Sequence, residues 1–201
     1  MLEAKGITYA FGGKPVLDRV SVRIACGEVV GLSGPSGAGK STLARILAGH
    51  LTPQEGSVML DGAALRPDGF SPVQLLFQSP ELAVNPRWRI RDILGEAFTP
   101  EPALLDRFDI AADWLDRYPH ELSGGELQRV TIVRCLDPRL RYILADEISA
   151  MLDPLTQARM WRSLLDVARE RRLGLLMVSH DQALIDRVAD RQLALSDAVI
   201  A

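Results

Sequence analysis

The residues best suited to chemistry in this chain form a glycine-rich loop. Residues 34–41 read Gly-Pro-Ser-Gly-Ala-Gly-Lys-Ser, which fits the pattern GxxxxGK[ST]. Its glycines let successive backbone N–H groups turn toward phosphate oxygens, Lys40 can reach terminal phosphates, and Ser41 can offer a hydroxyl to Mg²⁺. The alternative is a glycine turn without a ligand. The loop stands between an apolar run and a helical pattern, which is the setting that phosphate binding requires.

Two adjacent carboxylates form a second candidate site. Asp146 and Glu147 directly follow the apolar run Tyr142–Ala145. A carboxylate at the end of a buried strand can hold a hydrated metal ion, and its neighbour can orient or deprotonate a water molecule. Taken alone, two acids after a strand are more often a turn or a helix cap. The glycine loop upstream favours the catalytic interpretation.

A third segment combines a helix cap with two glycines. Ser123 and Glu126 have the S-x-x-E spacing of a capping box, so a well-capped helix start is the simplest interpretation. Gly124 and Gly125 lie between them, and they remove side chains from the first turn of that helix. Because the exposed N–H groups of a helix N-terminus attract anions, the segment is also a candidate anion site.

The elements that must position these residues follow from the hydrophobic pattern. Leu2–Tyr9 and Leu17–Ile24 predict a hairpin, Glu28–Leu32 a buried strand, and Thr42–Ala48 a helix that Gly49 ends. Further strands are expected at 57–60, 73–77, 142–145 and 175–178, with a final pair ending at Ala201.

The helical segments lie between and after these strands. Prolines break residues 79–137 into short pieces, in which Leu104–Leu115 is helical in pattern and a second helix begins at Ser123. A later helix is capped by Asp153 and ended by Gly174, and a short one covers 182–188. The apolar stripe of the helix that Asp153 caps comprises Leu155, Ala158, Trp161, Leu164, Leu165 and Ala168. Strands that alternate with helices predict an α/β fold with a largely parallel core sheet, an N-terminal antiparallel β part and a helical insertion.

Composition excludes several classes of protein. The chain has 201 residues, of which 47% are hydrophobic, and a net charge of −3, which suits one compact domain and gives no sign of a nucleic-acid partner. It shows no apolar run long enough to span a bilayer and no signal-peptide pattern, so we expect a cytosolic protein. Cys26 and Cys135 are far apart, and both are expected to be buried, reduced thiols.

Taken together, these motifs resemble the nucleotide-binding subunits of ATP-binding-cassette (ABC) transporters, over nearly the whole chain and in the order of that family. Gly34–Thr42 matches the Walker A loop, Gln78 the Q-loop glutamine, and Ser123–Glu126 the signature. Asp146 and Glu147 match Walker B, and Ser149–Asp153 matches the D-loop. His180 matches the switch histidine, and Tyr9 stands where the family places an aromatic residue that stacks on adenine, with Phe11 as a second candidate.

The resemblance implies a set of functional residues and two cofactors, ATP and Mg²⁺. The implied nucleotide contacts are Tyr9, Gly34, Pro35, Ser36, Gly37, Ala38, Gly39, Lys40, Ser41, Thr42, Ser123, Gly124, Gly125 and Glu126. The implied metal ligands are Ser41, Gln78 and Asp146, and the implied catalytic residues are Glu147, His180, Gln78 and Lys40. The P-loop NTPase fold implied is one ABC domain over 1–201, with an ATP-binding core at 1–78 and 138–201 and a helical signature subdomain at 79–137.

The resemblance also implies partners. In this family two cassettes enclose ATP between them, so a second cassette, identical or paralogous, is expected at the cytoplasmic face of the membrane. Transmembrane permease subunits would dock on the insertion, where Trp88 and Trp114 are candidate contacts or core residues. The local sequence around Gln78, Tyr118–Glu121 and Asp146–Asp153 is most similar to that of importers of dipeptides, oligopeptides and nickel. Such importers also use a solute-binding protein.

Two other functions remain open from the residues. The first is a soluble, non-transport ABC ATPase acting in translation, DNA maintenance or cluster assembly, which usually carries tandem cassettes, coiled insertions or basic patches. The second is a P-loop kinase or a small GTPase, in which Gln78, the signature and His180 would have no role. We therefore expect an ABC importer ATPase.

Overall fold

A computed structural model describes residues 1–65, 69–150 and 152–195, and these divide into two compact units. The first unit contains the described residues of Met1–Leu75, Arg141–Glu147 and Arg171–Ala201. The second unit contains those of Leu76–Leu140 and Ile148–Glu170. Each unit is described below by itself.

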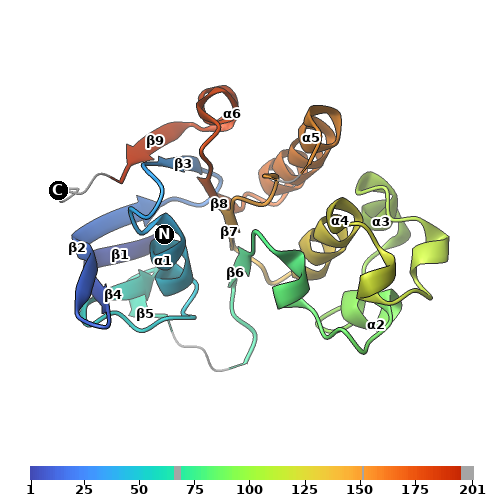
Figure 1. Ribbon diagram of the computed structural model, residues 1–201, viewed down its shortest axis with the longest axis horizontal. Helices are drawn as coiled ribbons and strands as arrows, with labels where there is room; N and C mark the ends of the chain where they lie inside the picture. The colour runs from blue at the N-terminus through green and yellow to red at the C-terminus, as the bar shows by residue number, and fades with distance from the viewer. Residues whose placement is uncertain (66–68, 151, 196–201) are drawn as a thin grey trace. The chain divides into compact units, whose positions relative to one another are not determined.

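An antiparallel sheet opens the first unit, in the order β2-β1-β4-β5 (Figure 1). Its strands are β1 (Leu2–Phe11), β2 (Lys14–Ile24), β4 (Glu55–Leu60) and β5 (Ala63–Ala64). Leu2 pairs with Ile24 and Tyr9 with Leu17 across the predicted hairpin. The two-residue turn of Gly12 and Gly13 has positive φ at both positions, which a hairpin of right-handed twist requires.

A parallel sheet forms the core of the same unit, in the order β6-β7-β8-β3-β9. Its strands are β3 (Val29–Ser33), β6 (Val73–Leu76), β7 (Tyr142–Asp146), β8 (Gly174–Val178) and β9 (Arg191–Ala194). Every residue of β7 and β8 is buried, as expected for strands covered on both faces. Two helices belong here: α1 (Lys40–Leu47) packs against β7 and β8, and α6 (Gln182–Val188) packs against β3.

The carboxyl ends of the parallel strands meet at one edge of this sheet. Leu32 of β3 and Asp146 of β7 both pair with Val178 of β8. Open α/β sheets bind their ligands at this edge, and the residues that follow these strands are the predicted site residues. The predicted parallel sheet is therefore confirmed. The second of the two predicted final strands, ending at Ala201, lies outside the described residues.

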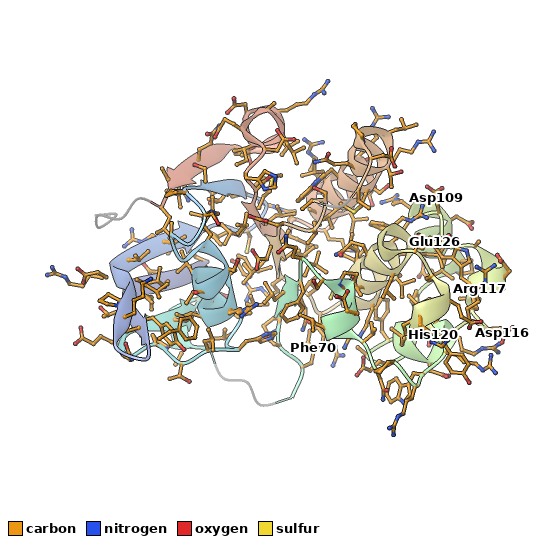
Figure 2. The ribbon with its side chains drawn as sticks, in the orientation of Figure 1. Phe70, Asp109, Asp116, Arg117, His120 and Glu126 are labelled. Atoms are coloured by element: carbon orange, nitrogen blue, oxygen red, sulfur yellow. The ribbon has the colours of Figure 1, made fainter. Side chains whose placement is uncertain are left out.

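The second unit is helical, and Figure 2 shows its labelled residues Asp109, Asp116, Arg117, His120 and Glu126 together. Its α-helices are α2 (Ile90–Leu94), α3 (Pro102–Arg107), α4 (Gly124–Cys135) and α5 (Pro154–Glu170). The 3₁₀ turns are η1 (Pro80–Ala83), η2 (Ala112–Trp114) and η3 (Pro119–Glu121). α4 is central, because it packs against α2, η1 and α5.

The two tryptophans of the predicted insertion differ in exposure. Trp88 is 40% exposed, whereas Trp114 is only 7% exposed. The Arg129 guanidinium lies 5.0 Å from the centre of the Trp114 ring and 3.5 Å from Asp109. Trp114 is therefore a core residue, which was one of the two interpretations left open for it.

The predicted helix over Leu104–Leu115 was too long, because α3 ends at Arg107. Asp109 adopts a left-handed conformation with φ 51°, and the Ile110 N–H donates to the Leu105 carbonyl at 2.9 Å. This is the Schellman ending of a helix, and aspartate tolerates its left-handed position better than most residues. The prediction was too long because the apolar spacing continues beyond Arg107 and neither glycine nor proline marks the end of the helix there.

Helix α5 begins as predicted but ends earlier. Asp153 accepts hydrogen bonds from the N–H groups of Leu155 and Thr156, both at 3.0 Å, and so caps the helix. The helix ends at Glu170 rather than at Gly174, and Arg172 takes the left-handed conformation with φ 53°.

Gly174 instead opens β8, where a Cβ atom would lie 2.5 Å from the Tyr142 ring. Most of the predicted apolar stripe of α5 is buried, but Leu155 is 62% exposed and Ala158 is exposed as well. The first turn of this helix therefore lies largely at the surface of its unit.

The two cysteines differ from one another. Cys135 is buried, and burial raises the pKa of its thiol to about 11. Cys26 is exposed, so the expectation of a buried thiol was wrong there. Its contact with the Tyr142 hydroxyl at 3.1 Å, helped by Arg141, lowers the pKa of the Cys26 thiol.

Candidate active site

The glycine loop connects β3 to α1, as its sequence predicts. Gly37 and Gly39 have φ values of 82° and 95°, in the left-handed region that other residues rarely adopt. A Cβ atom on Gly39 would also lie 2.8 Å from the Leu17 side chain. Both the backbone conformation and the neighbouring β2 residues therefore require glycine at position 39.

Lys40 is the first residue of α1 and is 7% exposed. Its Nζ donates to the carbonyl oxygens of Gly34 and Pro35, each at 2.8 Å, so the ammonium lies across the loop. The N-cap Gly39 offers no side chain, and the first turn of α1 holds no acidic residue. The N–H groups and the positive end of the helix dipole are thus left for an anion, such as a phosphate.

Ser41 and Asp146 lie together although they are 105 residues apart. The Ser41 hydroxyl donates to Asp146 Oδ1 at 2.9 Å, and Asp146 is 4% exposed. Burial raises the pKa of Asp146, the Glu147 charge raises it further, and the Ser41 hydrogen bond opposes both effects.

These two oxygen groups are ligands that suit Mg²⁺. Among the described residues, no group of three or more His, Cys, Asp or Glu side chains could hold a metal by itself. Mg²⁺ commonly takes one or two protein oxygens and completes its shell with phosphate and water, so Ser41 and Asp146 fit that role.

Glu147 and His180 follow β7 and β8 at the same sheet edge. Glu147 Oε2 lies 3.8 Å from His180 Nδ1, and the Glu147 N–H donates to the Val178 carbonyl at 3.0 Å. Glu147 is a non-glycine residue with φ 51°. Backbone strain of this kind clusters at functional sites, because it persists only where the surrounding structure holds the backbone in that conformation.

A cavity of about 490 Å³ adjoins the glycine loop. It is lined by Pro35–Ala38 of the loop and by Lys14–Asp18 of β2, with Val20 and Leu195. Tyr9 and Phe11 are not among the described lining residues; their rings pack edge to face at 4.9 Å, and Phe11 is 51% exposed.

Sequence reasoning missed the β2 segment. Residues 14–18 carry no motif, and their place beside the loop depends on the hairpin pairing, so no local signal identifies them.

The predicted signature forms the start of α4 in the second unit. The Ser123 N–H donates to Glu126 Oε2 at 2.7 Å, and the Glu126 N–H donates to Ser123 Oγ at 3.4 Å, which completes the capping box. Hydrogen bonds with Ser123 lower the pKa of Glu126. Neither this box nor the helix ladder uses the N–H groups of Gly124 and Gly125.

Gln78 also lies in the second unit, just after β6, and is exposed. The structure thus brings together two pairs of predicted residues within the first unit, Ser41 with Asp146 and Glu147 with His180. Gln78 and the signature belong to the other unit. Among the described residues, no helix has the length and apolar character needed to cross a bilayer.

Comparisons with known proteins agree with this architecture. The family model described as ABC transporter matches residues 17–150. The chain is 36% identical to the nickel import ATP-binding protein NikE of Rhodospirillum rubrum, over 93% of this chain and 74% of that protein. It is also 36% identical to the thiamine import ATP-binding protein ThiQ of Salmonella choleraesuis, over 100% of this chain and 89% of that protein.

Solved structures give the same answer. A dimeric ABC transporter cassette has a TM-score of 0.85 and 26% identity, and the alignment covers 100% of this chain and 96% of that one. A dimeric post-hydrolysis state of an ATP-binding cassette with ADP and Pi matches with the same values. The chain belongs to the ABC transporter family, and it is an ATP-binding, ATP-hydrolysing cassette.

Proposed function

We propose that this cassette hydrolyses ATP to drive the import of a solute, in the manner of importers of nickel complexes or peptides. Three similar relatives are named as import ATP-binding proteins: one for nickel, one for thiamine and one, from Brucella ovis, for peptides. The Brucella ovis relative is 34% identical, and the alignment covers 90% of this chain and 63% of that protein. These names favour transport over a soluble, non-transport ATPase. The nickel and thiamine import proteins are named for different solutes although each is 36% identical to this chain. Other subunits would therefore select the solute.

The phosphate groups of ATP would bind at the start of α1. The loop N–H groups and Lys40 would hold the β and γ phosphates, and Thr42 would lie in the same first turn. Mg²⁺ would be held by Ser41 and Asp146, with Gln78 as a further ligand, and it would neutralise charge on the phosphates.

Glu147 would act as the general base on the attacking water. The water oxygen forms a bond to the γ phosphorus, its proton passes to Glu147, and the bridging P–O bond breaks with its electron pair leaving on ADP. His180 would contact the γ phosphate and stabilise the charge that develops there. The observation that carries this proposal is the approach of Glu147 and His180, at 3.8 Å, beside the buried Asp146.

The substitution Glu147→Gln tests the catalytic assignment. It keeps the size of the side chain but removes the base, so we expect hydrolysis to fall by about 100-fold or more while ATP binding is retained. Steady-state phosphate release and equilibrium ATP binding measure the two effects. Glu55→Gln, at an exposed position on β4, is the matched control and should hydrolyse ATP normally. Turnover near the wild-type rate in Glu147→Gln would refute the role.

The signature would bind the nucleotide held by a second cassette, identical or paralogous. Supporting this, the matching solved cassettes are dimers, and the N–H groups of Gly124 and Gly125 stay outside the capping box. In the Glu147→Gln background, Ser123→Arg should abolish ATP-dependent dimerisation, measured by light scattering, without weakening ATP binding by the monomer. Ser57→Arg on exposed β4 is the control. Undiminished dimerisation of Ser123→Arg would contradict the sandwich.

The second unit would contact a transmembrane permease subunit at the cytoplasmic face of the membrane. Trp88 and Leu82 are large apolar side chains of this unit that are 40% and 69% exposed. Isolation of the chain from native membranes should recover a membrane subunit and, more weakly, a solute-binding protein, and Trp88→Ser should reduce that recovery. Recovery of ribosomes or DNA instead would support the non-transport alternative.

The division of labour along the chain also stays a proposal. We assign ATP binding to residues 1–78 and 138–201 and the signature function to residues 79–137. In the compact units, residues 148–170 group with the helical part, so α5 would move with the signature if the two units move separately.

A further inference from the structure

The two signature glycines differ in what surrounds them. A Cβ atom placed on Gly124 would meet nothing within 4 Å, whereas one placed on Gly125 would lie 2.8 Å from Leu152 Cδ2. Neither glycine has a positive φ, so the backbone would accept alanine at both positions. A methyl group on Gly125 would therefore have to displace the end of the Leu152 side chain, whereas a methyl group on Gly124 would have open space.

Leu152 itself is held by a fixed local structure. Its N–H donates to the Ser149 carbonyl at 3.1 Å. Ser149 is 7% exposed, and its Oγ accepts hydrogen bonds from Trp161 Nε1 and Gln157 Nε2, both at 3.1 Å. Trp161 is 3% exposed in the buried face of α5. A buried hydroxyl that accepts two hydrogen bonds holds Ser149 in place, and Ser149 in turn holds the Leu152 N–H.

We propose that Leu152 is a positioning residue for the signature: its side chain sets where Gly125 and the adjacent N–H groups lie. This inference rests on the proposed function, since it deepens the role given there to the signature. A close-packed contact transmits small displacements, and N–H groups that bind a phosphate must be placed accurately. Neither Leu152 nor Trp161 would itself touch the nucleotide in this role.

The test uses two substitutions that exchange one carbon atom across the contact. Gly125→Ala adds a methyl group, and Leu152→Val removes one carbon from the opposing side chain. We expect Gly125→Ala to lower kcat by about 10- to 100-fold, because a misplacement of about 1 Å can cost that much. The double variant Gly125→Ala/Leu152→Val should recover at least about threefold of this loss, since the new methyl group then has room.

A matched control separates this contact from a general effect of Leu152. Gly124→Ala adds the same methyl group where no side chain lies nearby. If Leu152 acts only on Gly125, then adding Leu152→Val to Gly124→Ala brings no recovery of kcat. A double variant Gly125→Ala/Leu152→Val no faster than Gly125→Ala overturns the proposal, because the methyl group would then act elsewhere. Recovery in both backgrounds overturns it as well.

A second variant guards against misfolding of Gly125→Ala. Leu152→Ala keeps the signature sequence intact and removes the contact, so kcat should fall by about tenfold while monomeric ATP binding stays within about twofold. An unchanged kcat in Leu152→Ala overturns the inference. Failure of the proposed function would give a different result. The wild-type chain would then either hydrolyse no ATP or hydrolyse it at a rate that Glu147→Gln leaves unchanged.

Discussion

The cassette contains two helix N-termini built from glycine-rich segments, and they are built differently. The N-cap of α1 is Gly39, which lies at φ 95° and gives no side-chain hydrogen bond to the helix. The N-cap of α4 is Ser123, which has an extended backbone and shares a capping box with Glu126. The first helix start leaves its N–H groups without a side-chain partner, and the second satisfies part of its own.

The glycines serve different physical purposes at the two places. In the loop before α1 the backbone itself turns through left-handed conformations, and the space at Gly39 is closed by Leu17. In α4 the backbone is ordinary helix, so only the neighbours of Gly124 and Gly125 can require glycine. Glycine is thus required by the backbone conformation in the first unit, and by packing or by a ligand in the second.

Between the two helix starts, the largest difference should come from the ammonium group at the start of α1. Lys40→Ala removes the charge that lies across the loop, and charged hydrogen bonds are worth about 1.5–3 kcal/mol, so ATP should bind about 10- to 100-fold more weakly. Titration with a fluorescent ATP analogue measures this. Lys5→Ala, a half-exposed lysine that pairs with Glu3, is the control and should bind normally. An unchanged affinity in Lys40→Ala would remove the basis for treating α1 as the phosphate site.

A pair of alanine substitutions tests the two reasons for glycine directly. Gly39→Ala should lower the free energy of unfolding by about 1–2 kcal/mol, because alanine is strained at that φ and its methyl group meets Leu17. Gly124→Ala should change it in the opposite direction, by about 0.5 kcal/mol, because alanine favours the helix. Urea unfolding of both variants gives the comparison. Equal signs would mean that the two glycine segments do not differ as described.

The smallest effect concerns pH and only the second helix start. The folded-state pKa of Glu126 lies below its ordinary value, so its ionised form stabilises the fold above that ordinary value and the contribution is lost as pH falls through the folded pKa. Glu126→Gln should therefore be less stable than wild type at pH 7 by about 0.3–1 kcal/mol.

The difference between Glu126→Gln and wild type should then shrink as the pH is lowered from 5 toward 3. Arg129 and Arg117 also favour the charged form, so the measurement should be made at low salt. Thermal unfolding at several pH values follows the difference. A gap that stays constant with pH would show that the charge of Glu126 plays no part in the cap.

Much of the fold could be predicted because its signals are local. The hairpin turn, the loop before α1, the Ser123 and Asp153 caps and the buried strands β7 and β8 all lie where their residue types place them. The errors occurred where local signals stop short. Helix α3 ends because Asp109 adopts a left-handed conformation, which the apolar spacing does not indicate. Gly174 does not mark a helix end; glycine is needed there because the Tyr142 ring leaves no space for a side chain.

The sequence by itself determined which residues could do chemistry and the order in which they occur. Gly34–Ser41, Ser123–Glu126 and the pair Asp146 and Glu147 carry their meaning in residue type and spacing, because helix starts and strand ends are local features.

Only the tertiary structure decided which distant atoms meet. The Ser41 hydroxyl reaches Asp146 across 105 residues, and Glu147 approaches His180, because parallel strands deliver their carboxyl ends to one edge of the sheet. The contact of Leu152 with Gly125 follows in the same way from the packing of α4 and α5. Spacing along the chain carries no information about such contacts, since they depend on how close-packed elements fit together.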